Sequence, residues 1–162
     1  MRRFGWIVSA LMALGCASTV ATATATAAPA PAVPRACAVS SQTIQITSLV
    51  FQPPAVAPGQ VSQAIVSAVN CTAVSQQASA EWLGRFVGSA PGIPAGCPVI
   101  DPLLQPMNFP PHGKLTGTVG YLVPGSCTAT GLVVTVEILQ NGKVVTQRSA
   151  ELTIVRPAQA RS

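Results

Sequence analysis

From Gln42 onward, apolar and polar residues alternate with a period of two, and proline and glycine interrupt the alternation at intervals. Successive residues of a β-strand point to opposite faces of a sheet, so this pattern is typical of half-buried strands. The sequence shows no sustained period of 3.6 residues, which an amphipathic helix requires. We therefore predict an all-β fold.

Six segments carry the alternating pattern, namely residues 44–51, 61–71, 78–86, 115–123, 132–138 and 143–155. In the first, the parity of the apolar positions slips, which indicates a bulge. In the third, alternation assigns Trp82 to the buried face as a core anchor. Asn141-Gly142 predicts a tight hairpin turn before the last segment, because both residues tolerate positive φ.

The connection over residues 88–113 contains seven prolines. Proline cannot donate to a central ladder, so this connection has room for at most one short edge strand. Loops of such length in a compact domain are usually functional or poorly ordered. Six or seven antiparallel strands in about 115 residues suit two sheets packed face to face.

Three features carry a resemblance at the level of pattern. Pro58-Gly59 opens the second strand, Trp82 sits on the third, and the Asn141-Gly142 hairpin precedes Leu152 to Val155. With these, the stretch resembles the immunoglobulin-like sandwich modules of secreted and cell-surface bacterial proteins. The resemblance implies an immunoglobulin-like two-sheet antiparallel sandwich of six or seven strands and implies no function. No cysteine is positioned for the inter-sheet disulfide of antibody domains.

The first 27 residues have the layout of a signal peptide. Arg2 and Arg3 precede an apolar run, Phe4 to Leu14, that is too short to span a bilayer, and Ala25-Thr26-Ala27 is a small-x-small cleavage site. A Pro/Ala-rich spacer (28–39), the sandwich (40–156) and a tail (157–162) follow. We expect a secreted, extracellular protein without a transmembrane segment.

Cys16 lies inside the signal peptide and raises the question of lipid attachment. Lipid-attachment signals have a branched aliphatic residue three positions before the cysteine, where this chain has Ala13. We therefore expect release as a soluble protein.

Four cysteines remain after the signal peptide: Cys37, Cys71, Cys97 and Cys127. Four cysteines allow three pairings, which spacing alone leaves open. If the strands run alternately up and down, Cys37 and Cys71 share one pole of the sandwich and Cys97 and Cys127 share the other. Bonded cysteines need Cα atoms within about 7 Å, so this topology favours Cys37–Cys71 and Cys97–Cys127. The closest cysteines are twenty-six positions apart, so we expect no zinc site.

Charge and titratable groups exclude several function classes. Beyond residue 27 the chain has seven Lys and Arg against four Asp and Glu, and the basic residues are scattered singly. We therefore expect no nucleic-acid partner. One histidine, His112, and four carboxylates are a thin inventory for acid–base chemistry. We expect no enzyme, no cofactor and no metal, with His112 as a solvated turn residue.

The leading functional hypothesis is a secreted, non-enzymatic interaction module, monomeric, that binds an unknown protein or cell-envelope component. Its expected contact surface is the loop from Cys97 to Gly113, which a disulfide and prolines would hold rigid. Phe109 is the aromatic residue that we expect to be exposed. The candidate binding residues are Pro98, Val99, Ile100, Asp101, Phe109 and His112.

Two alternatives remain open. In Gly96 to Leu104, a Cys-Pro pair precedes Val99 and Ile100 and an Asp-Pro pair follows them. This segment resembles the reactive loop of the secreted subtilisin-inhibitor family and implies a protease inhibitor presenting Cys97 to Leu104, with Val99 and Ile100 nearest the scissile bond. The second alternative is a carrier of a small apolar ligand held between the sheets.

Overall fold

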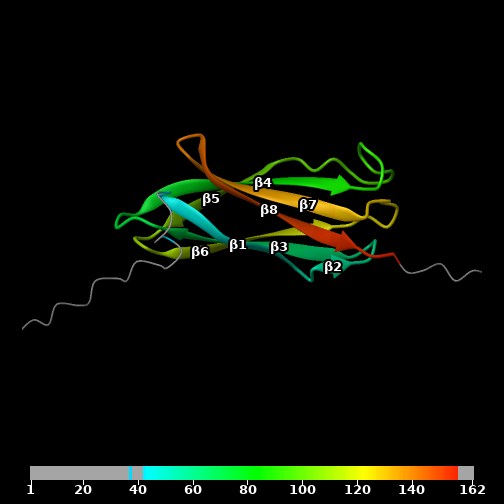
Figure 1. Cartoon of the computed structure of the whole chain (residues 1–162), viewed down its shortest axis with the longest axis horizontal. Coiled ribbons are helices and arrows are strands. Elements are labelled where there is room, and N and C mark those ends of the chain that lie inside the picture. Colours follow the sequence, from blue (N-terminus) through cyan, green and yellow to red (C-terminus); the bar gives the residue numbers. More distant parts are fainter. Residues whose placement is uncertain (1–36, 38–41, 157–162) are drawn as a thin grey trace, which may run out of the picture. The chain divides into compact units, whose positions relative to one another are not determined.

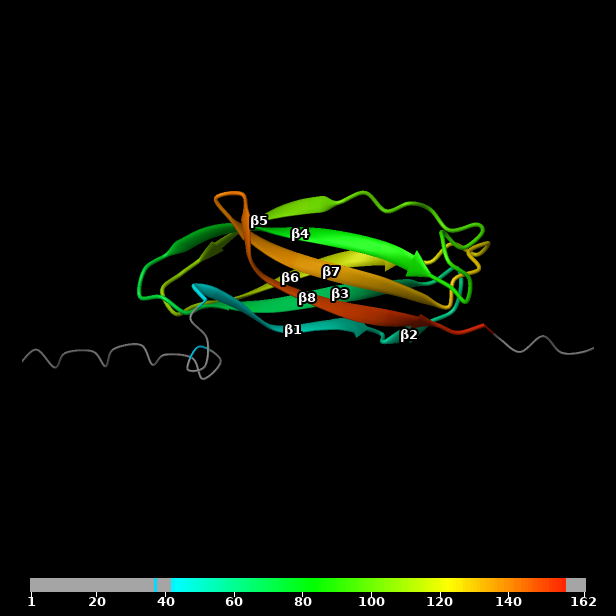
Figure 2. The same cartoon turned by 45° about the horizontal axis from the view of Figure 1, so that its top comes forward.

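The computed structural model describes Cys37 and residues 42–156, and within these residues it contains eight β-strands and no α-helix. The strands form two sheets that face each other (Figures 1 and 2). The predicted signal peptide, the tail and all of the spacer except Cys37 lie outside the described residues. The described residues contain no helix that is long and apolar enough to cross a membrane.

The smaller sheet has three strands in the order β1-β3-β6: β1 (Ile44–Gln52), β3 (Val61–Asn70) and β6 (Lys114–Leu122). The larger has five in the order β2-β8-β7-β4-β5: β2 (Ala55–Val56), β8 (Lys143–Ile154), β7 (Gly131–Gln140), β4 (Gln76–Val87) and β5 (Leu103–Phe109). Neighbouring strands are antiparallel except β2 and β8, which are parallel. β1 of the smaller sheet packs beside β8 of the larger, which closes that side of the sandwich.

The prediction of an all-β, two-sheet fold is confirmed. All six predicted segments are strands, and the short edge strand is β5. The predicted bulge is the register shift of β1 between Ile46 and Ser48. Asn141 and Gly142 have φ values of 52° and 72°, as the hairpin requires. The two-residue β2 was not expected, because prolines surround it.

The core lies between the two sheets and is built by alternate residues of each strand. Trp82 is completely buried at the middle of β4, which confirms the prediction that it anchors the core. On the facing sheet, Gly117 of β6 pairs with Val66 of β3. A Cβ atom added to Gly117 would lie 3.3 Å from the side chain of Val66 and 3.3 Å from that of Trp82, so these side chains meet in the same region. The tryptophan therefore fills the space where the two sheets meet.

Both predicted disulfides are present. The Cα atoms of Cys37 and Cys71 are 5.3 Å apart, and those of Cys97 and Cys127 are 4.4 Å apart. Disulfides persist in oxidising compartments, so the pair indicates an oxidising environment. The first bridge fastens the chain before β1 to the end of β3, and the second fastens the β4–β5 connection to the segment before β7.

Asn70 organises the pole that carries the first disulfide. Its fully buried Nδ2 donates to the carbonyl oxygens of Val74 (2.7 Å) and Pro110 (2.9 Å). Its Oδ1 accepts from the backbone N–H and the hydroxyl of Thr72. Asn70-Cys71-Thr72 has the sequence of a glycosylation acceptor, but this amide is committed to the fold.

Candidate functional site

The connection between β4 and β5, residues 88–102, is tethered at its centre; we refer to it as the tethered loop. Besides the Cys97–Cys127 bridge, Thr128 N–H donates to the Ala95 carbonyl oxygen at 2.8 Å. Gly96 has a φ of +70°, and a Cβ there would lie 2.2 Å from the Ser126 carbonyl oxygen. Only glycine lacks the Cβ atom that would block this close approach of the two backbones, so the tether requires glycine at position 96.

Ile100 fixes the second half of the tethered loop. Its side chain packs against the core beside Gly84 of β4, where a Cβ would lie 3.0 Å from Ile100 Cδ1 and 3.2 Å from Tyr121 Cε1. Desolvation by burial raises the pKa of Tyr121 to about 12, so its ring is neutral in this contact at physiological pH. The loop is therefore held by a covalent bond at Cys97 and by packing three residues later.

This contact predicts the result of a double-mutant cycle. Gly84→Ala is expected to lower the free energy of unfolding by about 1 to 3 kcal/mol, because the new methyl group overpacks against Ile100. In an Ile100→Ala background the same change should cost less, with a coupling of at least about 0.5 kcal/mol. Denaturant unfolding of the four proteins measures the cycle. Additive effects would show that Ile100 does not occupy this position.

Apolar side chains are concentrated and exposed on this part of the molecule. Of the ten well-exposed large apolar residues in the described part of the chain, four fall between residues 93 and 104. We call these four the loop surface; they are Ile93, Val99, Leu103 and Leu104. Val99 is the most exposed, at 72%. The four are close in sequence but do not share one face, because Leu103 and Leu104 are adjacent residues of β5 and point to opposite sides of the larger sheet.

Two shallow hollows border the loop surface. One, of about 280 Å³, lies between the tethered loop and β4 and is lined by Gly84, Arg85, Phe86, Ile93, Pro98, Val99 and Ile100. The other, of about 500 Å³, lies on the outer face of the larger sheet and is lined by Gln77, Ala78, Ser79, Leu104, Pro106, Asn108, Leu139, Asn141 and Gly142. Leu104 lines the larger hollow, and Ile93 and Val99 line the smaller one.

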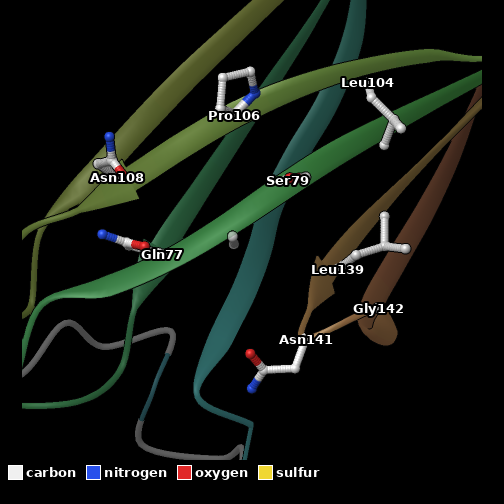
Figure 3. A pocket seen from close by; sticks show the side chains of 9 residues that line it. Gln77, Ser79, Leu104, Pro106, Asn108, Leu139, Asn141 and Gly142 are labelled. Atoms are coloured by element: carbon white, nitrogen blue, oxygen red, sulfur yellow. The ribbon is translucent and has the colours of Figure 1, made fainter.

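Figure 3 shows the chemistry of the larger hollow. Gln77 and Asn108 face each other across β4 and β5, and Asn141 of the hairpin turn points in from the opposite side. Leu104, Leu139 and Pro106 supply apolar contacts. The lining of this hollow is thus uncharged, with amide donors and acceptors around small apolar patches.

The structure separates the predicted binding residues into two groups. Pro98, Val99 and Asp101 are exposed on the tethered loop. Phe109 is the last residue of β5 and His112 lies in the turn that follows, so both are at the opposite end of this strand, which at the rise of a strand is on the order of 20 Å away. The segment from Cys97 to Gly113 is therefore not one continuous loop, because residues 103–109 form the predicted edge strand, and its role as a contact surface stays a prediction.

The expectation for Phe109 is also wrong, because its side chain is only 1% exposed. Phe109 and Met107 alternate onto the inner face of β5 and belong to the core. His112 is in the predicted turn, with a φ of 51°, but it is only half-exposed and its Nδ1 is shielded without a hydrogen-bond partner in the described residues. Asp101 and His112 are too far apart to act together.

Leu103 and Leu104 belong to the segment of the inhibitor alternative but are not among the candidate binding residues, although the sequence contains a usable signal. Adjacent residues of a strand point to opposite faces, so two consecutive leucines in an edge strand cannot both reach the core. Both are in fact well exposed. Ile93 lacks a comparable signal, because its exposure depends on the course of the tethered loop.

No group of three or more His, Cys, Asp or Glu side chains in the described residues is arranged to hold a metal ion. Glu81 of β4 lies directly opposite Glu137 of β7 on the outer face of the larger sheet. Facing like charges disfavour folding slightly, so this pair does not serve stability.

Comparisons with known proteins identify no family. No protein-family model matches the chain. No curated protein matches it in sequence. Among solved structures, it is similar to a cycloisomaltooligosaccharide glucanotransferase of Paenibacillus sp. complexed with cycloisomaltoheptaose, with a TM-score of 0.54 and 5% identity over 68% of this chain and 14% of that one.

A second similar structure is the alkylpurine DNA glycosylase AlkC of Pseudomonas fluorescens, bound to DNA containing an abasic site analog. Its TM-score is 0.51, with 13% identity over 70% of this chain and 30% of that chain. The chain thus spans less than a third of each of these two proteins. At such identities the similarity shows the fold alone.

Proposed function

We propose that the protein is a secreted, non-enzymatic, immunoglobulin-like interaction module that binds an extracellular or cell-envelope protein through the loop surface. The observation that carries the proposal is the group of four exposed apolar side chains on and beside a loop fixed by Cys97 and Ile100. A rigid apolar contact surface loses little entropy on binding, which favours association. Secretion accords with the signal-like leader and the two disulfides.

The strand order supports an immunoglobulin-like assignment. In immunoglobulin-like domains, strands A, B and E are neighbours in one sheet and strands G, F and C are neighbours in the other. Here β1, β3 and β6 correspond to A, B and E, and β8, β7 and β4 correspond to G, F and C. Strand β5 is one additional strand beside C. Trp82 occupies strand C in this correspondence, as the buried tryptophan does there. The disulfides differ, since both bridge connections at the poles rather than the two sheets.

The distribution of titratable groups favours binding over catalysis. The chain's single histidine and Asp101, which flanks the loop surface, are separated by the length of β5. General acid–base catalysis needs partners within hydrogen-bond reach of one reacting group. Exposed apolar side chains beside two hollows, whose linings contain Arg85 as their one charged residue, suit recognition without turnover.

Capture of partners from native culture medium tests the proposal. Val99→Asp and Leu104→Asp are expected to weaken capture by at least about tenfold, because a carboxylate would be desolvated in an apolar contact. Val50→Asp, at a similarly exposed position on β1, is the matched control and should capture as the natural protein does. The captured protein is identified by mass spectrometry and rebound in purified form. Equal capture by all three variants would refute the loop surface as the contact site.

A protease inhibitor is a second candidate, favoured by one observation. Val99 projects into solvent while Cys97 and Ile100 on either side of it are anchored, which is how rigid inhibitors present a scissile segment. Inhibition of subtilisin by the purified protein measures this activity. No inhibition at micromolar concentration would remove the candidate.

A carrier of a small apolar ligand is less well supported. The more apolar of the two hollows, at about 280 Å³, is at the lower limit of ordinary ligand sites and lies between the tethered loop and β4.

A further inference from the structure

Strand β6 is one edge of the smaller sheet, with β3 as its neighbour (Figure 2). Just before β6, Asn70 N–H donates to the Gly113 carbonyl oxygen, and just after it Val123 N–H donates to the Gln60 carbonyl oxygen, both at 2.9 Å. Hydrogen-bonded and non-bonded pairs alternate along an antiparallel ladder, and the β3–β6 register has no shift. The odd-numbered residues of β6 therefore bond to β3.

It follows that the even-numbered residues of β6 direct their N–H and C=O groups away from β3, toward the free edge. These residues are Lys114, Thr116, Thr118, Gly120 and Leu122, and all five are exposed. No backbone hydrogen bond in the described part of the chain reaches them from that side. The edge thus offers five donors and five acceptors along a strand whose pairing with β3 has no register shift.

The other sheet edges have features that block strand addition. Edge β5 contains Pro106, which lacks an N–H group. Edge β1 is bulged, and Arg148 Nη1 donates to its Thr47 carbonyl oxygen at 3.1 Å. Strand β2 covers the end of β8, and β1 packs beside the rest. Natural proteins protect edges in these ways, so the regular β6 edge points to a strand partner.

We infer that this partner is a second copy of the chain, paired antiparallel through β6 to form one continuous six-stranded sheet. The strand is self-complementary: a register centred on Thr118 places Thr118 opposite its counterpart, Thr116 opposite Gly120, and Lys114 opposite Leu122. Each of the five facing pairs contributes two backbone hydrogen bonds. Thr–Thr pairs across strands are favourable, and the Lys114 stem covers Leu122.

The charges on this face do not oppose pairing with a second copy. On the outer face of the smaller sheet, Lys114 is the one charged residue among the strand residues β1, β3 and β6. In the self-paired register its counterpart is the apolar Leu122, so two copies meet without opposed like charges. The sequence alone gave no reason to expect self-association, because burial of one sheet edge cannot be read from alternation.

Sedimentation velocity over a micromolar concentration series tests the inference. The natural protein is expected to form a reversible dimer, and Thr118→Pro should raise its dissociation constant by at least about tenfold, because proline removes an edge donor without breaking a bond to β3. Thr118→Val keeps the donor and should dimerise normally. Circular dichroism and thermal melting confirm that the variants fold.

A second measurement is independent of any loss of folding. A Thr118→Cys variant should cross-link to its counterpart with a short bis-maleimide, because Cα atoms of a hydrogen-bonded pair are about 5.5 Å apart. In a Thr116→Cys variant the new side chain faces Gly120 instead and should cross-link poorly. A natural protein that stays monomeric, a Thr118→Pro variant that dimerises unchanged, or stronger cross-linking at 116 would each overturn the inference. A monomer that binds a strand of another protein at β6 would also overturn the inference.

Discussion

Replacing Trp82 with alanine is expected to lower the free energy of unfolding by about 3 to 5 kcal/mol. The indole is completely buried where β4 of the larger sheet faces β3 of the smaller one, so its removal leaves a cavity that neither sheet can close alone. A domain of this size has about 5 to 15 kcal/mol of stability, so the variant will be marginal. Guanidinium unfolding measures the change.

Trp82→Phe is the control, since it keeps an aromatic ring and should cost clearly less than alanine. A loss below about 1 kcal/mol for alanine would contradict the role of Trp82 as the main core anchor.

Removing the Cys97–Cys127 bridge by alanine substitution at both positions is expected to destabilise the domain by about 3 to 4 kcal/mol, because a loop of this length regains its entropy in the unfolded chain. The same change frees the tethered loop, so capture of the partner should also weaken. Removing Cys37–Cys71, which closes a similar loop at the other pole, provides the comparison.

The two double variants should lose similar stability, but only the first should lose binding beyond what the stability change explains. Equal binding by both, measured well below their unfolding midpoints, would show that the tether does not organise the contact surface.

Much of the fold could be predicted from sequence because the physical signals are local. Alternation over Leu132 to Ile138 fixes which side chains of β7 are buried, and Asn141-Gly142 fixes the turn that follows. The disulfide pairing needed one further step, the up-and-down course of the strands, since Cys37 and Cys71 are close only through topology.

The bounds of the strand at residues 103–109 were harder to predict, because its proline suggests a loop while the alternation of its apolar residues suggests a strand. Pro106 is accommodated in β5 because β5 is an edge strand, and that position depends on tertiary pairing with β4. Once residues 103–109 are a strand, Phe109 must face the core, and its predicted exposure fails for the same reason.

The candidate site could be predicted only in part. The cysteine and prolines identified a rigid loop, and Val99 is its most prominent side chain. The anchoring of Ile100 beside Gly84 could not be predicted, since it depends on the path of the loop across β4. The free edge of β6 likewise depends on which strand has no neighbour, a property of the whole sheet.

Photo-crosslinking from position 99 tests the central claim most directly. A benzoylphenylalanine at this position, in protein added to native culture medium, is expected to form a covalent adduct with one major partner, whereas the same residue at the exposed position 50 of β1 should form none. The partner must be the protein that Val99→Asp fails to capture. Adducts that form from position 50 and not from position 99 would contradict the claim that the loop surface is where this protein binds.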